Sequence, residues 1–154
     1  MELINFDIEP KGDSIRVIPI GDIHLGNVNC NVKKLRDTIN WIENKEDTYI
    51  IGMGDYIEAI NFTDPRFNPN NIPPQYLSRL GDIVIKEKEE LIKIFEPVSD
   101  RIICLLEGNH ERKVYEKYHI DIQREICDSL EVIDASMIGF IRFCLLYTSP
   151  SPRD

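Results

Sequence analysis

Three short apolar runs rich in β-branched residues stand out along the chain. They cover residues 14–20, 49–53 and 101–106, and a glycine follows each run within two positions. Apolar runs of this length are typical of strands buried on both faces of a parallel sheet. A glycine at the end of a strand allows the backbone to turn sharply. The pattern therefore predicts three buried strands whose carboxyl ends lead into tight turns.

Elsewhere, apolar residues recur every three or four positions, which is the period of an amphipathic helix. The predicted helices cover residues 31–44, 75–95 and 120–130. A segment rich in asparagine and proline, residues 61–74, predicts a loop between the second strand and the long helix. Residues 131–143 are apolar enough to predict one or two further strands.

The order strand–helix–strand–helix–strand predicts an α/β fold with a parallel sheet and right-handed crossovers. A chain of 154 residues has room for one domain with a sizeable core, and we assign residues 1–143 to it. In open α/β sheets the functional cleft lies outside the carboxyl ends of the strands. The turns after the three strands are therefore where we expect the chemistry.

The final residues, 144–154, depart from this pattern. Their sequence can be encoded by a transposase end joined to a sequencing adapter, in frame with Phe143. We interpret them as a non-native, translated tail, and we expect the natural protein to be cut off near Phe143. The alternative is a genuine Ser/Pro-rich tail. A non-native tail of this kind carries no information about the native fold.

The composition, with 42% hydrophobic and 29% charged residues, is that of an ordinary globular protein. The formal net charge of −9 argues against a general nucleic-acid or anionic-membrane binder. No apolar stretch approaches the roughly 18 residues of a membrane span, and no signal peptide is evident. The four cysteines show no paired spacing, which favours a reducing, cytoplasmic setting.

The three turns carry the side chains of a metal site. Asp22 and His24 follow the first strand, Asp55 follows the second, and Asn109 and His110 follow the third. Carboxylates, imidazoles and a carboxamide are ligands that suit a divalent cation. Their occurrence at three successive strand ends predicts that they converge on one cleft.

The spacing suggests a role for each side chain. Asp22 and His24 are two positions apart, so in extended backbone they point to the same side and can share one ion. Asp55 could bridge two ions through its two oxygens, and Asn109 offers a carbonyl oxygen. Two ions about 3.5–4 Å apart can activate water and stabilise an in-line displacement at phosphorus. His110, if free of metal, can protonate the leaving alkoxide.

With these blocks the chain resembles the calcineurin-like metallophosphoesterase superfamily, which shows Asp-x-His, Gly-Asp and Gly-Asn-His-Asp/Glu in succession. The three matching blocks of this chain are Gly21-Asp22-Ile23-His24, Gly54-Asp55 and Gly108-Asn109-His110-Glu111. The resemblance implies an α-β-β-α sandwich, of which mainly the first β-α-β-α-β half would be present. It implies a hydrolase that uses a dinuclear centre and metal-activated water on phosphomonoesters or phosphodiesters, including nucleotides or nucleic acid.

By the same resemblance, Asp22 and His24 bind the first metal, Asp55 bridges, and Asn109 binds the second metal. His110 then contacts the phosphate and donates a proton. The metals would be divalent ions such as Mn, Fe, Zn or Ni. The family also shows a later Gly-His and Gly-His-x-His, which this sequence lacks. We therefore expect a partial domain that is inactive as it stands.

Other interpretations stay open. A binding or scaffold protein could keep the fold without catalysis, although all five candidate site residues are present. A structural zinc module is disfavoured by the absence of Cys-x-x-Cys spacing. Arg112 and Lys113 could face a phosphate or begin a solvated helix, and Tyr56 and Glu58 could line the cleft. His119 is expected to be a surface residue.

Overall fold

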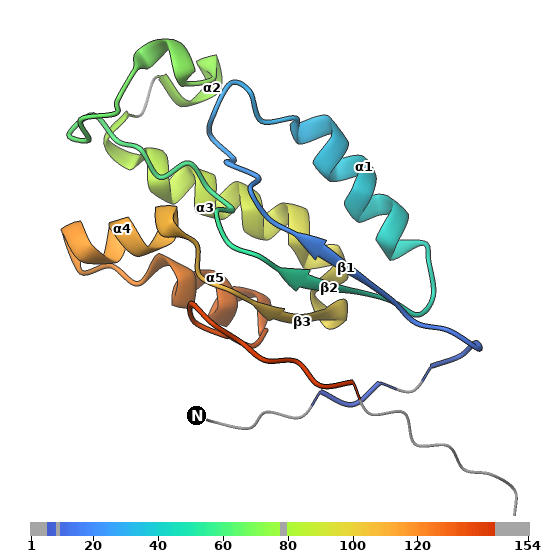
Figure 1. The fold of residues 1–154 in the computed structure, drawn as a ribbon. Helices are drawn as coiled ribbons and strands as arrows, with labels where there is room; N and C mark the ends of the chain where they lie inside the picture. The colour runs from blue at the N-terminus through green and yellow to red at the C-terminus, as the bar shows by residue number, and fades with distance from the viewer. Residues whose placement is uncertain (1–5, 9, 78–79, 144–154) are drawn as a thin grey trace, which may run out of the picture.

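A three-stranded parallel sheet organises the molecule, which we describe from a computed structural model covering residues 6–8, 10–77 and 80–143 (Figure 1). The strands are β1 (Arg16–Ile20), β2 (Thr48–Gly52) and β3 (Ile102–Leu105), and they lie in the order β1-β2-β3. The register of β1 and β2 runs from Arg16 opposite Thr48 to Ile20 opposite Gly52. All three carboxyl ends therefore meet at one edge.

Five α-helices accompany the sheet in the part of the chain that the structure describes. They are α1 (Val32–Glu43), α2 (Pro74–Leu77), α3 (Ile83–Phe95), α4 (Asn109–Tyr118) and α5 (Ile122–Leu130). Short 3₁₀ turns occupy Pro69–Asn71, Leu80–Asp82 and Glu96–Arg101. The mixed α/β class predicted from the sequence is confirmed.

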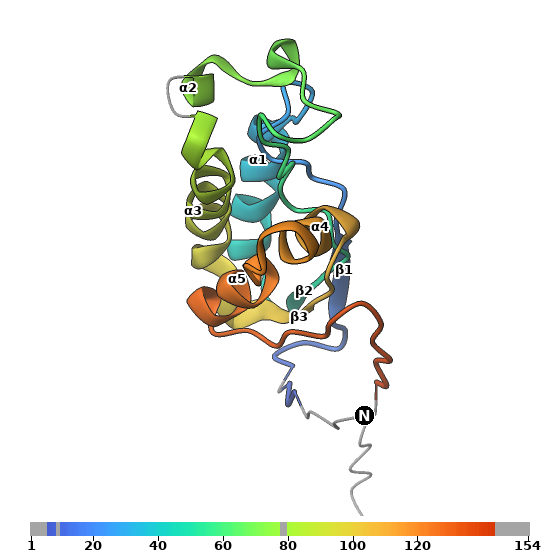
Figure 2. The same ribbon diagram turned by 90° about the vertical axis from the view of Figure 1, so that its left-hand side faces the viewer.

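Helices α1, α3 and α5 lie on the same face of the sheet (Figure 2), and α4 lies beyond its carboxyl edge (Figure 1). The physical reason is the order of the strands. Both crossovers, β1 to β2 and β2 to β3, step in the same direction across the sheet. Crossovers of one hand that step the same way place their helices on one face.

The core lies between this face and the helices. Buried positions alternate along β2, and all four residues of β3 are buried. Ile50, Leu91 and Phe95 are among the fully buried side chains that join the sheet to α3. Burying apolar area at about 25 cal/mol per Å² is the main term that holds such a layer together. The sheet and its helices form a firm base for the loops at the carboxyl edge.

The predicted strands and the helices at 31–44 and 120–130 match observed elements to within a few residues at each end, but the long helix does not. Within 75–95 the structure shows α2, the 3₁₀ turn at Leu80–Asp82 and then α3. The prediction of one continuous helix was wrong, because the apolar stripe also suits a broken helix whose parts pack on two clusters. Ile72, Tyr76 and Ile83 form the second cluster.

The prediction of strands in 131–143 was also wrong for the described residues. This segment forms a single parallel bridge, Leu105 with Asp134, and then leaves the sheet. Ile138 and Phe140 are 78% and 87% exposed, so the apolar pattern of this segment does not indicate buried side chains. The predicted tail, 144–154, lies outside the described residues.

Helix α4 was not among the helices predicted from apolar periodicity, but it agrees with the interpretation that Arg112 and Lys113 begin a solvated helix. It has one buried apolar residue, Val114, and its other buried side chains are His110 and Glu111. A helix whose inward face is mainly polar has no apolar stripe for a sequence pattern to detect. Among the described helices, none is long and apolar enough to cross a membrane. Cys30, Cys104 and Cys127 are free thiols.

Candidate metal centre

The loops after β1 and β2 continue side by side beyond the ends of their strands. The amide of Asp22 donates to the carbonyl oxygen of Gly54 at 3.1 Å, and that of His24 donates to the carbonyl oxygen of Asp55 at 3.1 Å. An isolated parallel bridge joins Leu25 to Ile57 further on. These backbone contacts carry both predicted motifs to the same place at the carboxyl edge.

Three candidate ligands sit in the left-handed region of backbone space. The φ angles are 49° at Asp22, 49° at His24 and 53° at Asp55. Positive φ is uncommon in residues other than glycine, although Asp and His are enriched among the exceptions. Such conformations persist only where the surroundings enforce them, and they cluster at functional sites. The strain here turns three metal-type side chains toward one another.

The loop before α4 comes into backbone contact with the loop after β2. A Cβ atom on Gly108 would lie 2.1 Å from the amide nitrogen of Asp55, so only glycine fits there. This close approach brings the third motif against the second. It explains in physical terms why a glycine precedes Asn109.

A buried carboxylate fastens these loops together. Glu111 is fully buried, and its two oxygens accept backbone N–H groups at 2.8–3.2 Å from Asp55, Tyr56, Ile57 and Gly108. Burial raises the pKa of this carboxyl, and the hydrogen bonds from the backbone oppose that shift. Sequence reasoning quoted Glu111 as part of a motif but gave it no role. Only the folded loops show that it holds the site together.

The candidate ligands come together as a cluster. One ligand atom from each of Asp22, His24 and Asp55 lies within 4.8 Å of the others, and His24 Nε2 is 3.9 Å from Asp22 Oδ1. The side-chain amide of Asn109 lies 3.2 Å from Asp55 Oδ2. All four side chains that the sequence predicted as metal ligands therefore meet at the carboxyl edge of the sheet.

The chemistry of the donor set tests whether it suits a cation. The Asn109 amide does not decide the question: turned over, its nitrogen donates to Asp55 Oδ2 and its oxygen accepts from the His110 amide, both at 3.2 Å, so its contacts are satisfied without an ion. Two carboxylates, one imidazole and one amide oxygen match the preferences of divalent ions. The residues fit a divalent metal.

His110 occupies a different position from the four ligands. It is 8% exposed, its backbone amide donates to Asp55 Oδ1 at 2.9 Å, and its ring lies 4.6 Å from that of His24, centroid to centroid. Its Nδ1 is hydrogen-bonded to the main-chain oxygen of Glu58. Because a carbonyl oxygen only accepts, Nδ1 carries a proton and Nε2 is the nitrogen left for other chemistry.

Glu58 adds a second group of metal-type side chains. Ligand atoms of His24, Glu58 and His110 also lie within 4.8 Å of one another. The interpretation that Glu58 lines the cleft agrees with this placement. The same interpretation of Tyr56 was wrong: its side chain is fully buried, and its hydroxyl donates to the main-chain oxygen of Leu106 at 2.8 Å. Burial raises the Tyr56 pKa well above its usual range.

The remaining candidates lie at the surface. Arg112 forms ion pairs with Glu107 at 3.7 Å and with Glu116 at 3.3 Å, and these partners hold its side chain on α4. Lys113 is exposed on the same helix, and His119 is exposed at its end, as predicted for that histidine. None of these three belongs to the cluster.

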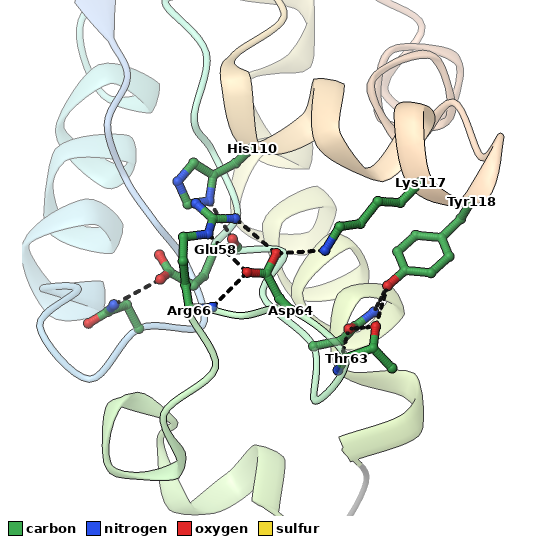
Figure 3. Close-up of polar contacts among 9 residues, drawn as sticks. Glu58, Thr63, Asp64, Arg66, His110, Lys117 and Tyr118 are labelled. Carbon is green, nitrogen blue, oxygen red and sulfur yellow. Dashed lines mark hydrogen bonds and ion pairs between the residues drawn. The ribbon is translucent and has the colours of Figure 1, made fainter.

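An ion-pair network fastens the 61–74 loop to α4 beside the cluster (Figure 3). Asp64 accepts two hydrogen bonds from the Arg66 guanidinium at 3.1 Å, and Lys117 donates to it at 3.0 Å. These partners hold the pKa of the Asp64 carboxyl well below its usual range. The loop predicted from its Asn and Pro content is thus anchored at the mouth of the site.

A second buried carboxylate, Glu87 of α3, lies behind the loops. It is fully buried; Oε2 accepts the Ala59 amide at 2.8 Å, while Oε1 has no partner. A Cβ atom on Gly26 would lie 1.9 Å from Oε1, so glycine makes room for this carboxyl. Burial raises the Glu87 pKa well above its ordinary value of 4.5, and the nearby Glu58 and Glu111 add to the shift.

The Glu87 pKa predicts how stability depends on pH. The folded protein keeps this proton at pH values where the unfolded chain has lost it, so the free energy of unfolding should fall as pH rises above about 4.5. Glu87→Gln has no ionisable carboxyl at this position, so the variant avoids that loss. The free energy of unfolding of the variant should therefore exceed that of wild type by an amount that increases with pH. The increase is up to about 1.4 kcal/mol per pH unit, until Glu87 ionises in folded wild type. Urea unfolding from pH 4 to 8 checks this, with exposed Glu96→Gln as the control. A gain that does not change with pH would contradict it.

Comparisons of the chain with protein-family models, with curated proteins and with solved structures found no match. We therefore infer the function from the residues at the carboxyl edge and from the motifs that they form.

Proposed function

We propose that this chain carries the metal-binding and acid groups of a divalent-metal-dependent phosphoesterase. The observation that carries the proposal is the meeting of Asp22, His24, Asp55 and Asn109 at one sheet edge, with His110 beside them. The resemblance of the three motifs to the calcineurin-like metallophosphoesterases supports the same conclusion. We further propose that the sheet, whose helices α1, α3 and α5 lie on one face, is half of that family's sandwich.

In this proposal Asp22, His24 and Asp55 hold a first divalent ion, and Asp55 and Asn109 hold a second. When bound, such ions supply activated water and positive charge for displacement at phosphorus. These residues contribute fixed positions, because the backbone at Asp22, His24 and Asp55 is held in the left-handed conformation. Pre-set ligands reduce the entropy that must be lost when an ion binds.

His110 is the proposed proton donor. Its Nδ1–H is held by the main-chain oxygen of Glu58, which leaves Nε2 to give a proton to the leaving oxygen when the ring is cationic. A carbonyl acceptor on the far nitrogen stabilises the cationic ring and fixes its orientation. The low exposure of the ring restricts access of water to it.

The proposed substrates are phosphomonoesters or phosphodiesters, and the net charge of −9 favours small substrates over duplex nucleic acid. We propose that turnover by this chain is low. Among the described residues the second ion would have Asp55 and Asn109 as its ligands, so its affinity should be the weaker of the two. A scaffold protein with the same fold is the second candidate, and the first experiment separates the two.

The test measures metal binding and hydrolysis together. Mn²⁺ binding is followed by calorimetry, and hydrolysis of bis-p-nitrophenyl phosphate is followed with saturating Mn²⁺. His110→Ala should reduce turnover by roughly 10²–10⁴-fold, the usual weight of general acid–base catalysis, or to the level of Mn²⁺ alone. It should leave metal binding near that of wild type, because His110 is not a ligand in this proposal.

His119→Ala is the matched control, since His119 is exposed outside the cluster. It should change neither measurement. Loss of bound metal in His110→Ala would show that its proposed role is wrong. Hydrolysis above the Mn²⁺ background in wild type would exclude the scaffold protein, and the absence of any Mn²⁺ binding would contradict the proposed metal centre.

A further inference from the structure

His24 presents its two ring nitrogens to two different carboxylates. Nε2 lies 3.9 Å from Asp22 Oδ1, on the side of the proposed metal, and Nδ1 lies 3.1 Å from Glu58 Oε2 on the other side. A neutral imidazole binds a metal through its unprotonated nitrogen. The proton must then sit on Nδ1, and the group that faces Nδ1 decides whether it stays there.

Nδ1 of His24 is shielded from water. The atom is buried and has no hydrogen-bond partner in the described part of the chain, although Glu58 Oε2 lies 3.1 Å away. A buried polar atom without a partner calls for an explanation. A small turn of the carboxylate, whose Oε2 is already at hydrogen-bond distance, would give Nδ1–H its acceptor.

Glu58 is itself held on several sides. Asn27 Nδ2 donates to its Oε1 at 3.1 Å, its backbone amide donates to the Leu25 oxygen at 2.8 Å, and its side chain is 14% exposed. Its main-chain oxygen accepts from His110 Nδ1. One residue therefore faces the Nδ1 atoms of both histidines of the site, through its side chain in one case and its main chain in the other. Figure 3 shows Glu58 beside the ring of His110.

We propose that Glu58 is a positioning residue: its carboxylate keeps the proton of His24 on Nδ1 and so presents Nε2 to a metal held with Asp22 and Asp55. The proposal rests on the proposed function, since it assumes that His24 is a ligand. Carboxylate partners of this kind fix the orientation of a metal-binding histidine and increase its basicity. Removing such a partner typically costs 10–100-fold in metal affinity.

The decisive measurement is the tautomer of His24 in the metal-free protein. Long-range ¹H–¹⁵N correlation spectra report which nitrogen of each imidazole is protonated, and the chain has only three histidines to assign. In wild type, His24 should carry its proton on Nδ1. In Glu58→Ala the His24 signals should move toward the Nε2–H form. His110 should not change, because its acceptor is a main-chain oxygen that alanine keeps.

Metal affinity is the second readout. Glu58→Ala should weaken Mn²⁺ binding by about 10–100-fold, whereas Glu58→Gln, which keeps an acceptor oxygen, should restore the Nδ1–H form and much of the affinity. Glu96→Ala, an exposed glutamate outside the site, should change neither measurement. Titration with Cd²⁺ should perturb Nε2 of His24 and leave its Nδ1 protonated.

Several results would overturn the assignment. They are a wild-type His24 protonated on Nε2, an unchanged His24 tautomer in Glu58→Ala, or Cd²⁺ bound through Nδ1. A change of both histidines in Glu58→Ala would show a loop collapse instead of a local effect and would equally overturn it. The proposed function fails separately, if no divalent ion binds, because the tautomer is measured without metal.

Discussion

Asp55→Asn should abolish binding of two divalent ions while leaving the fold intact. In the proposed centre this carboxylate is the one group shared by both ions, and its backbone tolerates asparagine because Asn, like Asp, accepts positive φ. The change removes the negative charge and one of the two carboxylate oxygens, so one of the two ions loses a ligand. We expect the apparent Kd for Mn²⁺ to rise by about 100-fold or more, which exceeds the 10–100-fold typical of groups that only support a ligand.

The stability of Asp55→Asn should not fall. Its new amide nitrogen would face the Asn109 side-chain amide, which lies 3.2 Å from Asp55 Oδ2 and can turn its oxygen toward the new donor, so a hydrogen bond is kept at this contact. Its oxygen would still accept the His110 amide. Calorimetry with Mn²⁺ and thermal unfolding of the metal-free protein test both parts. Asp128→Ala on α5, which is exposed, is the control. Two ions bound with near wild-type affinity would show that Asp55 does not bridge.

Glu111→Ala should cause the largest loss of stability of any substitution in the site. The change would leave the backbone N–H groups of Asp55, Tyr56, Ile57 and Gly108 without their acceptor. Each buried donor left unpaired costs about 1–3 kcal/mol, and partial relaxation will recover some of that cost. We expect the free energy of unfolding to fall by about 3–5 kcal/mol, a large share of the 5–15 kcal/mol typical of a domain.

Urea unfolding of the metal-free protein measures this loss. Glu111→Gln keeps one acceptor oxygen in place of two and should lose roughly half as much. Glu116→Ala, an exposed position on the same helix, should change stability by no more than about 0.5 kcal/mol. A Glu111→Ala protein within about 1 kcal/mol of wild type would mean that these loops find other acceptors, and the fastening role would be wrong.

Features that depend on neighbouring residues were predictable from the sequence. The strands were predictable because each buries one continuous apolar run, and helices α1 and α5 because each buries one apolar stripe. Both patterns involve only residues that are close in sequence. The gathering of Asp22, Asp55 and Asn109 at one edge was predictable too, since parallel strands bring their carboxyl ends together. These features need only chain order and periodicity.

Where prediction failed, the deciding contact was distant in sequence or the pattern was ambiguous. α4 has a polar inward face whose partner is the loop after β2, and a stripe analysis cannot detect that. The segment 131–143 is apolar, yet it bonds to β3 only around Asp134 before leaving the sheet. Apolar character alone does not state which surface a segment will cover.

By itself, the sequence determined which side chains form the candidate site and at which sheet edge they lie, because strand order and motif position are properties of the chain. Only the tertiary structure decided how those side chains are held. The left-handed backbone at Asp22, His24 and Asp55 and the clamp by Glu111 arise from contacts between loops. The approach of Glu58 to His24 also arises from a contact between loops. A side chain of the site points in one direction only when a residue from another strand end holds it there.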